Sequence, residues 1–123
     1  MRIKIIFRAL VVDGELDESE TARKIFLALP IEGKVNRWGD EIYFEIPVNA
    51  ELGINARADM EIGELGYWPE GRSFCIFFGP TPASKNEKPR AYSDVNVIGR
   101  LLDTPVEKLK AIKRGTWVRI EKA

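Results

Sequence analysis

The chain has 123 residues, of which 45% are hydrophobic and 31% charged, so it is long enough for one domain with a core and lacks the composition of a disordered protein. Its 19 basic and 19 acidic residues give no net charge, which argues against a nucleic-acid-binding protein with the usual basic excess. A single cysteine excludes an intrachain disulfide, and the absence of histidine removes the commonest metal ligand. We therefore expect one domain over residues 1–123, without a cofactor or a bound metal.

No segment is typical of export or of a membrane span. The strand-like run Arg2–Phe7 follows Met1 directly and is too short for the hydrophobic region of a signal peptide. No apolar stretch approaches the roughly 20 residues of a membrane-spanning helix. We expect a cytoplasmic protein that binds neither membranes nor nucleic acids.

The N-terminal part predicts β-structure followed by a helix. Arg2–Phe7 is rich in β-forming residues, and residues 9–12 continue the pattern up to the turn pair Asp13-Gly14. This segment is therefore either two strands or one bent strand. Asp17, followed three residues later by Glu20, has the spacing of a capping box, and apolar residues then recur at helical spacing.

The segment after this first helix predicts a hairpin and then irregular structure. Pro30 ends the helix. Ile31–Arg37 and Glu41–Ile46 are rich in β-forming residues and flank the turn Trp38-Gly39-Asp40. Asn49–Met60 has no regular pattern and is expected to cross the surface.

The centre of the chain predicts two more strands, Glu64–Trp68 and Ser73–Phe78, joined by a turn at residues 69–72. The second strand is apolar almost throughout, so both of its faces require cover, as in a barrel or a sandwich. Side chains alternate along a strand. We therefore expect one set to fill the interior, Phe74, Ile76 and Phe78, and the other set to face a groove, Cys75 and Phe77.

The C-terminal part predicts two strands around a second helix. Lys85–Arg90 is polar and is expected to be a loop, and Asp94–Leu101 is rich in β-forming residues. Thr104, followed by a proline and then Glu107, predicts a capped helix start, and Thr116–Ile120 predicts the last strand. Because strands and helices do not alternate regularly, the pattern favours an all-β fold with two short helices, such as a capped barrel.

Three segments resemble one known family: NRWGDEIYFEIPV (residues 36–48), GYWPEGRSFCIFFGPTP (66–82) and VNVIGRL (95–101). They are similar to the small, atypical cyclophilin-like proteins of bacteria and archaea. The resemblance implies a closed cyclophilin-like β-barrel with a helix at each open end.

Classical cyclophilins are peptidyl-prolyl isomerases that bind an extended proline-containing peptide in a shallow apolar groove. Their key arginine lies in the strand that resembles Tyr43–Pro47, where this chain offers Phe44 or Glu45 according to a one-residue shift in alignment. The enzymes also have a histidine at the start of the segment that resembles residues 95–101, and this chain has Val95 near that position. Because neither Phe44 nor Glu45 can donate the hydrogen bonds of a guanidinium, the resemblance implies a barrel without efficient isomerase activity.

The resemblance implies a groove lined by seven residues: Phe44, Glu45, Trp68, Cys75, Phe77, Tyr92 and Asn96. Aromatic side chains crowd the same segments, and they either belong to the core and its rim or, in part, line a concave site: Trp38, Tyr43, Tyr67, Trp68, Phe77, Phe78 and Tyr92. Such a groove would bind an extended proline-containing peptide or a small apolar ligand. Asn96 would hydrogen-bond the ligand backbone or its own neighbouring loop. Without a histidine to activate it, Cys75 is expected to be an inert buried thiol.

Two other hypotheses stay open. An isomerase with a rearranged site would need a cation beside the groove, from Arg37, Arg72 or Arg90, whereas an oligomerising module would use the exposed aromatic residues as an interface. Glu41 and Glu45 share a face of their predicted strand about 13 Å apart. This is too far for a pair of acid/base carboxylates, so we expect two solvated charges.

Overall fold

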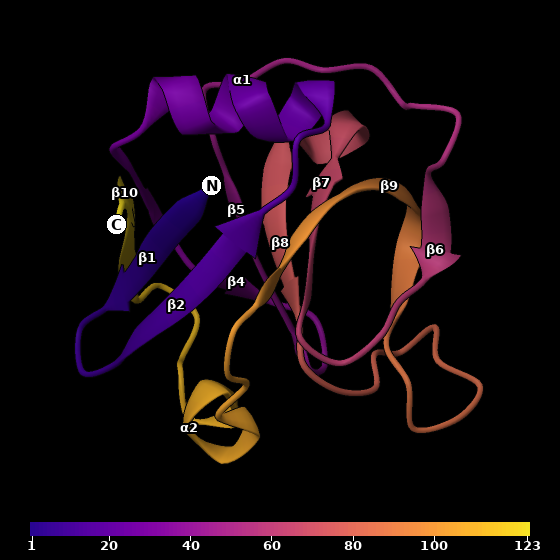
Figure 1. The fold of residues 1–123 in the computed structure, drawn as a ribbon. Helices are drawn as coiled ribbons and strands as arrows, with labels where there is room; N and C mark the ends of the chain where they lie inside the picture. Colours follow the sequence, from indigo (N-terminus) through magenta and orange to yellow (C-terminus); the bar gives the residue numbers. More distant parts are fainter.

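The computed structural model describes all 123 residues and contains ten strands and two α-helices (Figure 1). The strands are β1 (Arg2–Phe7), β2 (Val11–Leu16), β3 (Ile31–Lys34), β4 (Asn36–Arg37), β5 (Glu41–Glu45), β6 (Arg57–Asp59), β7 (Glu64–Trp68), β8 (Ser73–Phe77), β9 (Arg90–Leu101) and β10 (Trp117–Lys122). The helices are α1 (Glu20–Ala28) and α2 (Val106–Lys110), and a 3₁₀ turn, η1 (Pro69–Gly71), joins β7 to β8.

The N-terminal segment forms two strands, but the turn is not at Asp13-Gly14 as predicted. The chain reverses at residues 8–10, where the Phe7 amide donates to the Leu10 carbonyl at 2.7 Å. Asp13 and Gly14 lie inside β2, where the Asp13 carboxylate pairs with Lys4 on β1 at 2.9 Å. A side chain at Gly14 would lie 3.3 Å from Ile3, so glycine serves strand packing here and not the turn.

One sheet contains nine of the strands in the order β3-β10-β1-β2-β9-β7-β8-β5-β4, and β6 pairs with β9 beside it. The edge strands β3 and β4 follow one another in the chain, separated by Val35, and are not hydrogen-bonded to each other. The fold is therefore mostly β with two helices, as expected, while a closed barrel is not confirmed by the hydrogen bonds. The predicted strand Ile31–Arg37 divides at Val35, and only its last two residues form the predicted hairpin with β5.

The two helices lie at opposite ends of the curved sheet (Figure 1). Ser19, and not Asp17, caps α1: its hydroxyl accepts from the Ala22 amide at 3.3 Å, while Asp17 accepts from the Ser19 amide. The predicted threonine cap of α2 is also wrong, because Pro105 precedes this helix without a side-chain cap. No helix is long and apolar enough to span a membrane.

Two hydrophobic clusters lie on opposite faces of β8. Phe74, Ile76 and Phe78 belong to the main core of 24 residues between the sheet and the helices. Cys75 and Phe77 belong to a second cluster of 5 residues on the outer face. The predicted division of this strand into two sets is thus confirmed, and the cover that its outer face requires comes from β6 and the start of β9.

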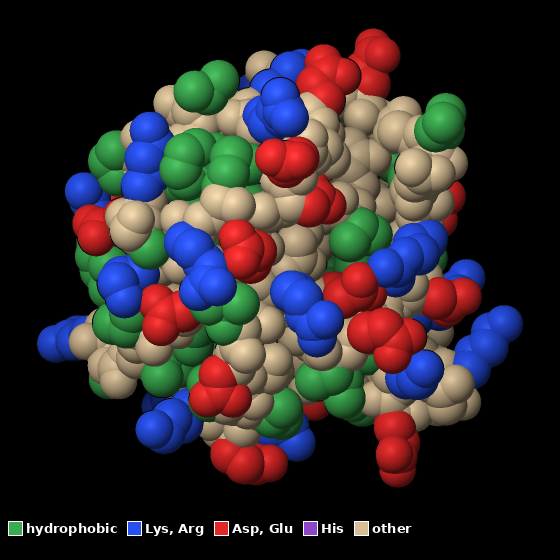
Figure 2. Space-filling model, in the orientation of Figure 1, with side chains coloured by type: hydrophobic (Ala, Val, Ile, Leu, Met, Phe, Trp, Pro, Cys, Tyr) green, Lys and Arg blue, Asp and Glu red, His purple; other side chains and the backbone are tan.

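Strand β9 begins at Arg90, earlier than the predicted Asp94, and this extension shapes the outer face. Its C-terminal part pairs with β7 and β2, whereas residues 90–95 pair with β6 (Figure 1). Asn49–Met60, predicted to be irregular, therefore includes the short strand β6. Figure 2 shows lysine and arginine interspersed with aspartate and glutamate over the visible face of the molecule.

Candidate functional site

An aromatic pocket of about 160 Å³ lies on the outer face of the sheet, beside the second cluster. It is lined by Trp38, Glu41, Tyr43, Trp68, Ala91, Tyr92 and Val95. These residues come from the β4–β5 turn and from β5, β7 and β9. Six of the seven are hydrophobic, and Glu41 supplies the one carboxyl group of the lining.

Alternation along β5 explains which of its side chains reach the pocket. Ile42 and Phe44 point into the main core, so Glu41 and Tyr43 point outward. Tyr43 lies opposite Cys75 of β8 in the antiparallel register. The same alternation on β7 directs Trp68 outward, and the pocket forms where these two strands lie on either side of β8.

Four aromatic rings form a continuous chain of edge-to-face contacts around the pocket. The ring centroids of Trp38 and Tyr92 are 6.0 Å apart, those of Tyr92 and Trp68 are 6.1 Å apart, and those of Trp68 and Tyr43 are 6.4 Å apart. The interplanar angles are 76°, 76° and 85°. Because each ring is held by a neighbour, their faces are arranged before any ligand arrives.

The Trp68 ring is fixed from two sides. Its indole Nε1 donates to the Ser93 hydroxyl at 2.8 Å, which ties β7 to β9. On the other side, Gly71 of η1 packs directly against the ring, and a Cβ there would lie 2.5 Å from Trp68 Cε3. Only a residue without a side chain fits at this position while the ring keeps its place.

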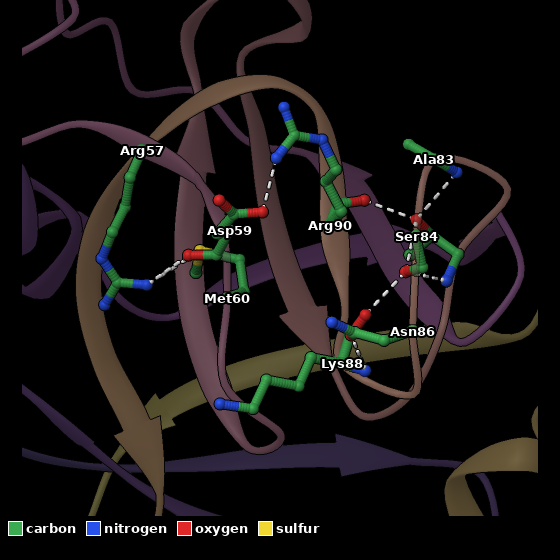
Figure 3. A network of polar contacts seen from close by, with 9 residues as sticks. Arg57, Asp59, Met60, Ala83, Ser84, Asn86, Lys88 and Arg90 are labelled. Carbon is green, nitrogen blue, oxygen red and sulfur yellow. Dashed lines mark hydrogen bonds and ion pairs between the residues drawn. The ribbon is translucent and has the colours of Figure 1, made fainter.

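The wall formed by β9 is held by the polar loop that precedes it. The Thr81 hydroxyl donates to the Arg90 carbonyl, and the Ser84 hydroxyl donates to the Lys88 carbonyl at 2.7 Å. The Arg90 guanidinium pairs with Asp59 at the end of β6 (Figure 3). Holding Arg90 by its backbone and its side chain fixes the first residues of β9, which carry the pocket wall.

Glu41 is buried without a positive partner. Its side chain is only 6% exposed, and no ion pair reaches it; the nearby Arg37 and Lys110 lie 3.6 and 4.0 Å from Asp40 instead. Burial raises the pKa of Glu41 to about 7, and a hydrogen bond from the Cys75 thiol partly offsets this rise. The prediction of a solvated charge is therefore wrong for Glu41, because Trp38 and the start of β9 cover it.

Cys75 lies beneath the pocket as a neutral thiol. Burial, together with the neighbouring Glu41 carboxylate, raises the pKa of Cys75 well above its ordinary value. The sulfur also lies 3.7 Å from the Ser73 carbonyl, so its one proton has two acceptors. The expected buried thiol is confirmed, and it offers no thiolate for covalent chemistry.

The structure brings together four of the seven residues expected at the groove. Trp68 and Tyr92 line the aromatic pocket, and Tyr92 is 73% exposed at its rim. Cys75 and Phe77 lie under it in the second cluster, without exposed surface. Phe44 lies elsewhere: it is in the main core, where its ring stacks on Phe74 with the centroids 5.4 Å apart.

Glu45 and Asn96 also lie away from the pocket. Glu45 is exposed and pairs with Arg72 at 2.7 Å, so the expectation of a solvated charge is confirmed for this residue. The Asn96 side chain accepts from the Gly53 amide at 2.7 Å and donates to the Glu51 carbonyl at 2.9 Å. It therefore orders the loop before β6, the second of the two roles expected for it.

Sequence reasoning missed Glu41 as a pocket residue, and it named Trp38 and Tyr43 only within a larger aromatic group. The pattern of β5 contained the necessary signal. Its apolar residues at positions 42, 44 and 46 mark the inward face, which leaves Glu41 and Tyr43 on the outward face. Aligning the strand by the position of a missing arginine directed attention to Phe44 and Glu45 instead.

The arginines that a rearranged isomerase site requires are occupied elsewhere. Arg37 donates to the carbonyls of Gly39 and Ile112, at 2.9 and 2.6 Å. Arg72 pairs with Glu45, and Arg90 pairs with Asp59. None of the three lines the aromatic pocket. No group of three or more cysteine, aspartate or glutamate side chains is placed to hold a metal ion.

The family model for cyclophilin-like proteins matches residues 1–121. The chain belongs to the cyclophilin-like family. This cyclophilin-like chain is also similar to a solved structure, the solution structure of the hypothetical protein AF2241 from Archaeoglobus fulgidus. The two are 42% identical with a TM-score of 0.84, and the match covers 100% of this chain and 95% of the other. No curated protein matches the chain. The expected family is thus confirmed.

The site of this cyclophilin-like chain combines one acidic group with several aromatic rings. It has one carboxyl group, with the neutral thiol of Cys75 beneath it, and no basic side chain lines it. It does have four prearranged aromatic faces around a hollow that opens to solvent.

Proposed function

We propose that this protein is a binding protein that takes one group of an extended peptide, such as a proline-containing peptide, or of a small molecule, in the aromatic pocket. The observation that carries the proposal is an open hollow of about 160 Å³ whose lining includes four aromatic rings in mutual contact. An apolar cavity of about 150 Å³ holds a benzene molecule, so the pocket suits a single compact group. The rest of a longer ligand would lie along the exposed rim.

We also propose that the protein does not isomerise prolyl bonds efficiently. The uncatalysed barrier is about 18–20 kcal/mol, and a donor or cation near the prolyl nitrogen helps to lower it. The charged group in the pocket is an acid, and the three candidate arginines are paired or hydrogen-bonded elsewhere. An apolar surface alone would give weak acceleration.

The test combines a binding assay with an exchange assay. Two of the three tryptophans, Trp38 and Trp68, line the pocket, so Trp117→Phe makes the fluorescence report on the pocket alone. In this background we expect a short Xaa-Pro peptide to change the emission, and we expect Tyr92→Ala to weaken binding at least fivefold. Tyr92 is 73% exposed, so its removal leaves the core intact.

The same peptide is then followed by NMR exchange spectroscopy at micromolar protein. We expect no acceleration of cis/trans interconversion. An acceleration that is lost on changing Arg37, Arg72 or Arg90 to alanine would overturn the non-catalytic reading, and binding unaffected by Tyr92→Ala would overturn the assignment of the site.

A further inference from the structure

The most unusual group in the pocket is the Glu41 carboxyl. It is buried among rings, no basic side chain pairs with it, and it stands beside a hollow that a ligand can enter. Buried charges in proteins are normally paired or bound to a cation, because an isolated charge in an apolar environment is costly. An acidic group that has no basic partner and lies beside a cavity is suited to a ligand that carries a positive charge.

We propose that the aromatic pocket selects an organic cation, an alkylated ammonium group, with Glu41 as its counter-ion. This inference rests on the proposed function of the pocket as a binding site and names its ligand class. It assigns Glu41 the charge contact and the rings of Trp38, Tyr43, Trp68 and Tyr92 the apolar contacts.

Aromatic faces and a carboxylate act together on such a ligand. The face of an aromatic ring attracts a cation within about 6 Å, most strongly for tryptophan, and two of the four rings are tryptophans. Alkyl groups on the nitrogen remove its hydrogen-bond donors, so the ligand needs no acceptor beyond the carboxylate. The volume of about 160 Å³ suits a trimethylammonium group, which is compact and apolar on its outside.

The charges around Glu41 favour a cation over an anion or a neutral group. The titratable side chains that line the pocket with Glu41 are Tyr43 on the same strand and Tyr92 on β9, with Cys75 of β8 beneath, and none is basic. The neighbouring residue Asp40 is the carboxylate that Arg37 and Lys110 approach, at 3.6 and 4.0 Å. Because burial raises the pKa of Glu41 to about 7, the Glu41 carboxyl group is partly protonated near neutral pH when the pocket is empty. A bound cation stabilises the Glu41 carboxylate, so binding releases the fraction of a proton that Glu41 carries in the empty pocket.

Choline and its neutral isostere 3,3-dimethyl-1-butanol test the proposal, because they share shape and differ in charge. We expect choline to bind at least tenfold more tightly by calorimetry at pH 7.5, and we expect Glu41→Gln to remove this preference. Glu45→Gln, which removes an exposed carboxylate from the same strand, is the matched control and should keep it. Measurements at pH 7 in two buffers of different ionisation enthalpy should show a fraction of a proton released for each choline bound.

The outcomes separate this inference from the proposed function. Equal binding of both molecules at the pocket would overturn the selection of a cation and leave the binding site standing. If neither molecule binds but a proline peptide still does, the selection of a cation would likewise be overturned and the pocket would remain a binding site. Failure of every ligand to perturb the pocket would overturn both proposals. Comparison of free trimethyllysine with a peptide that contains it then distinguishes a small molecule from a protein partner.

Discussion

Replacing Glu41 by glutamine is expected to remove a pH-dependent loss of stability. The amide has nearly the shape of the carboxyl group but cannot ionise. In the folded protein, burial raises the pKa of Glu41 from 4.5 to about 7. The folded state therefore binds this proton more tightly than the unfolded state does, so the stability that the protonated group contributes is lost as the pH rises between these two values.

The size of the effect follows from the pKa difference. At about 1.4 kcal/mol for each pKa unit, the change from 4.5 to about 7 corresponds to about 3 kcal/mol. The wild-type protein should lose this amount, relative to Glu41→Gln, between pH 4.5 and pH 8. Other carboxylates act in the opposite sense: hydrogen bonding to the N-terminal ammonium lowers the pKa of Glu15, for example. They are present in both proteins, so they cancel in the difference.

The assay is urea unfolding of both proteins at pH 4.5, 6, 7 and 8. The free energy of unfolding of Glu41→Gln minus that of the wild type should rise steadily across this range. Glu45→Gln removes an exposed carboxylate from the same strand and should change the free energy by less than about 1 kcal/mol at each pH. A difference for Glu41→Gln that stays flat across the range would refute the burial of a titrating carboxyl group in the pocket.

Three further changes test the packing around the site. Gly71→Ala should displace the Trp68 ring, because the new methyl group would lie 2.5 Å from it. The change should alter the near-ultraviolet circular dichroism, weaken ligand binding and lower the free energy of unfolding by about 1–3 kcal/mol. An unchanged spectrum would contradict the packing of Gly71 against this ring. Thr81→Val removes the hydrogen bond to the Arg90 carbonyl and should cost about 1–3 kcal/mol in urea unfolding, and no loss would show that this bond does not hold the loop. Phe44→Leu should lower stability by about 1 kcal/mol without changing ligand affinity, because Phe44 lies in the main core. A loss of affinity without a loss of stability would show that Phe44 contacts the ligand.

The local parts of the fold could be predicted from the sequence. Strands β7 and β8 are separated only by η1 and Arg72, and the apolar run of β8 indicated its burial on both faces. The turn pair Asp13-Gly14 misled because its residues serve strand pairing, and the real turn at residues 8–10 lacks a distinctive pair. Strand β6 was missed because its partner, the early part of β9, lies far along the chain.

The site was predicted only in part because its cover is not local. Trp68 and Tyr92 were expected at the groove and line the pocket, whereas Phe44 was expected there in place of Tyr43, although alternation along β5 puts Phe44 on the inward face. The burial of Glu41 could not be foreseen, since it depends on β9 folding over β5 and on the position of Trp38 in the β4–β5 turn. Nothing in the sequence near Gly71 indicated that it supports the Trp68 ring.

The most direct test of the aromatic pocket as the binding site is a ¹H–¹⁵N spectrum that resolves the three tryptophan indole signals during a ligand titration. Trp38 and Trp68 line the pocket, whereas Trp117 lies on β10 with its indole Nε1 donating to Glu32 at 3.0 Å. Titration with choline, or with an Xaa-Pro peptide, is expected to shift the signals of Trp38 and Trp68 and to leave that of Trp117 in place. Shifts confined to Trp117, or to residues outside the pocket, would contradict the account.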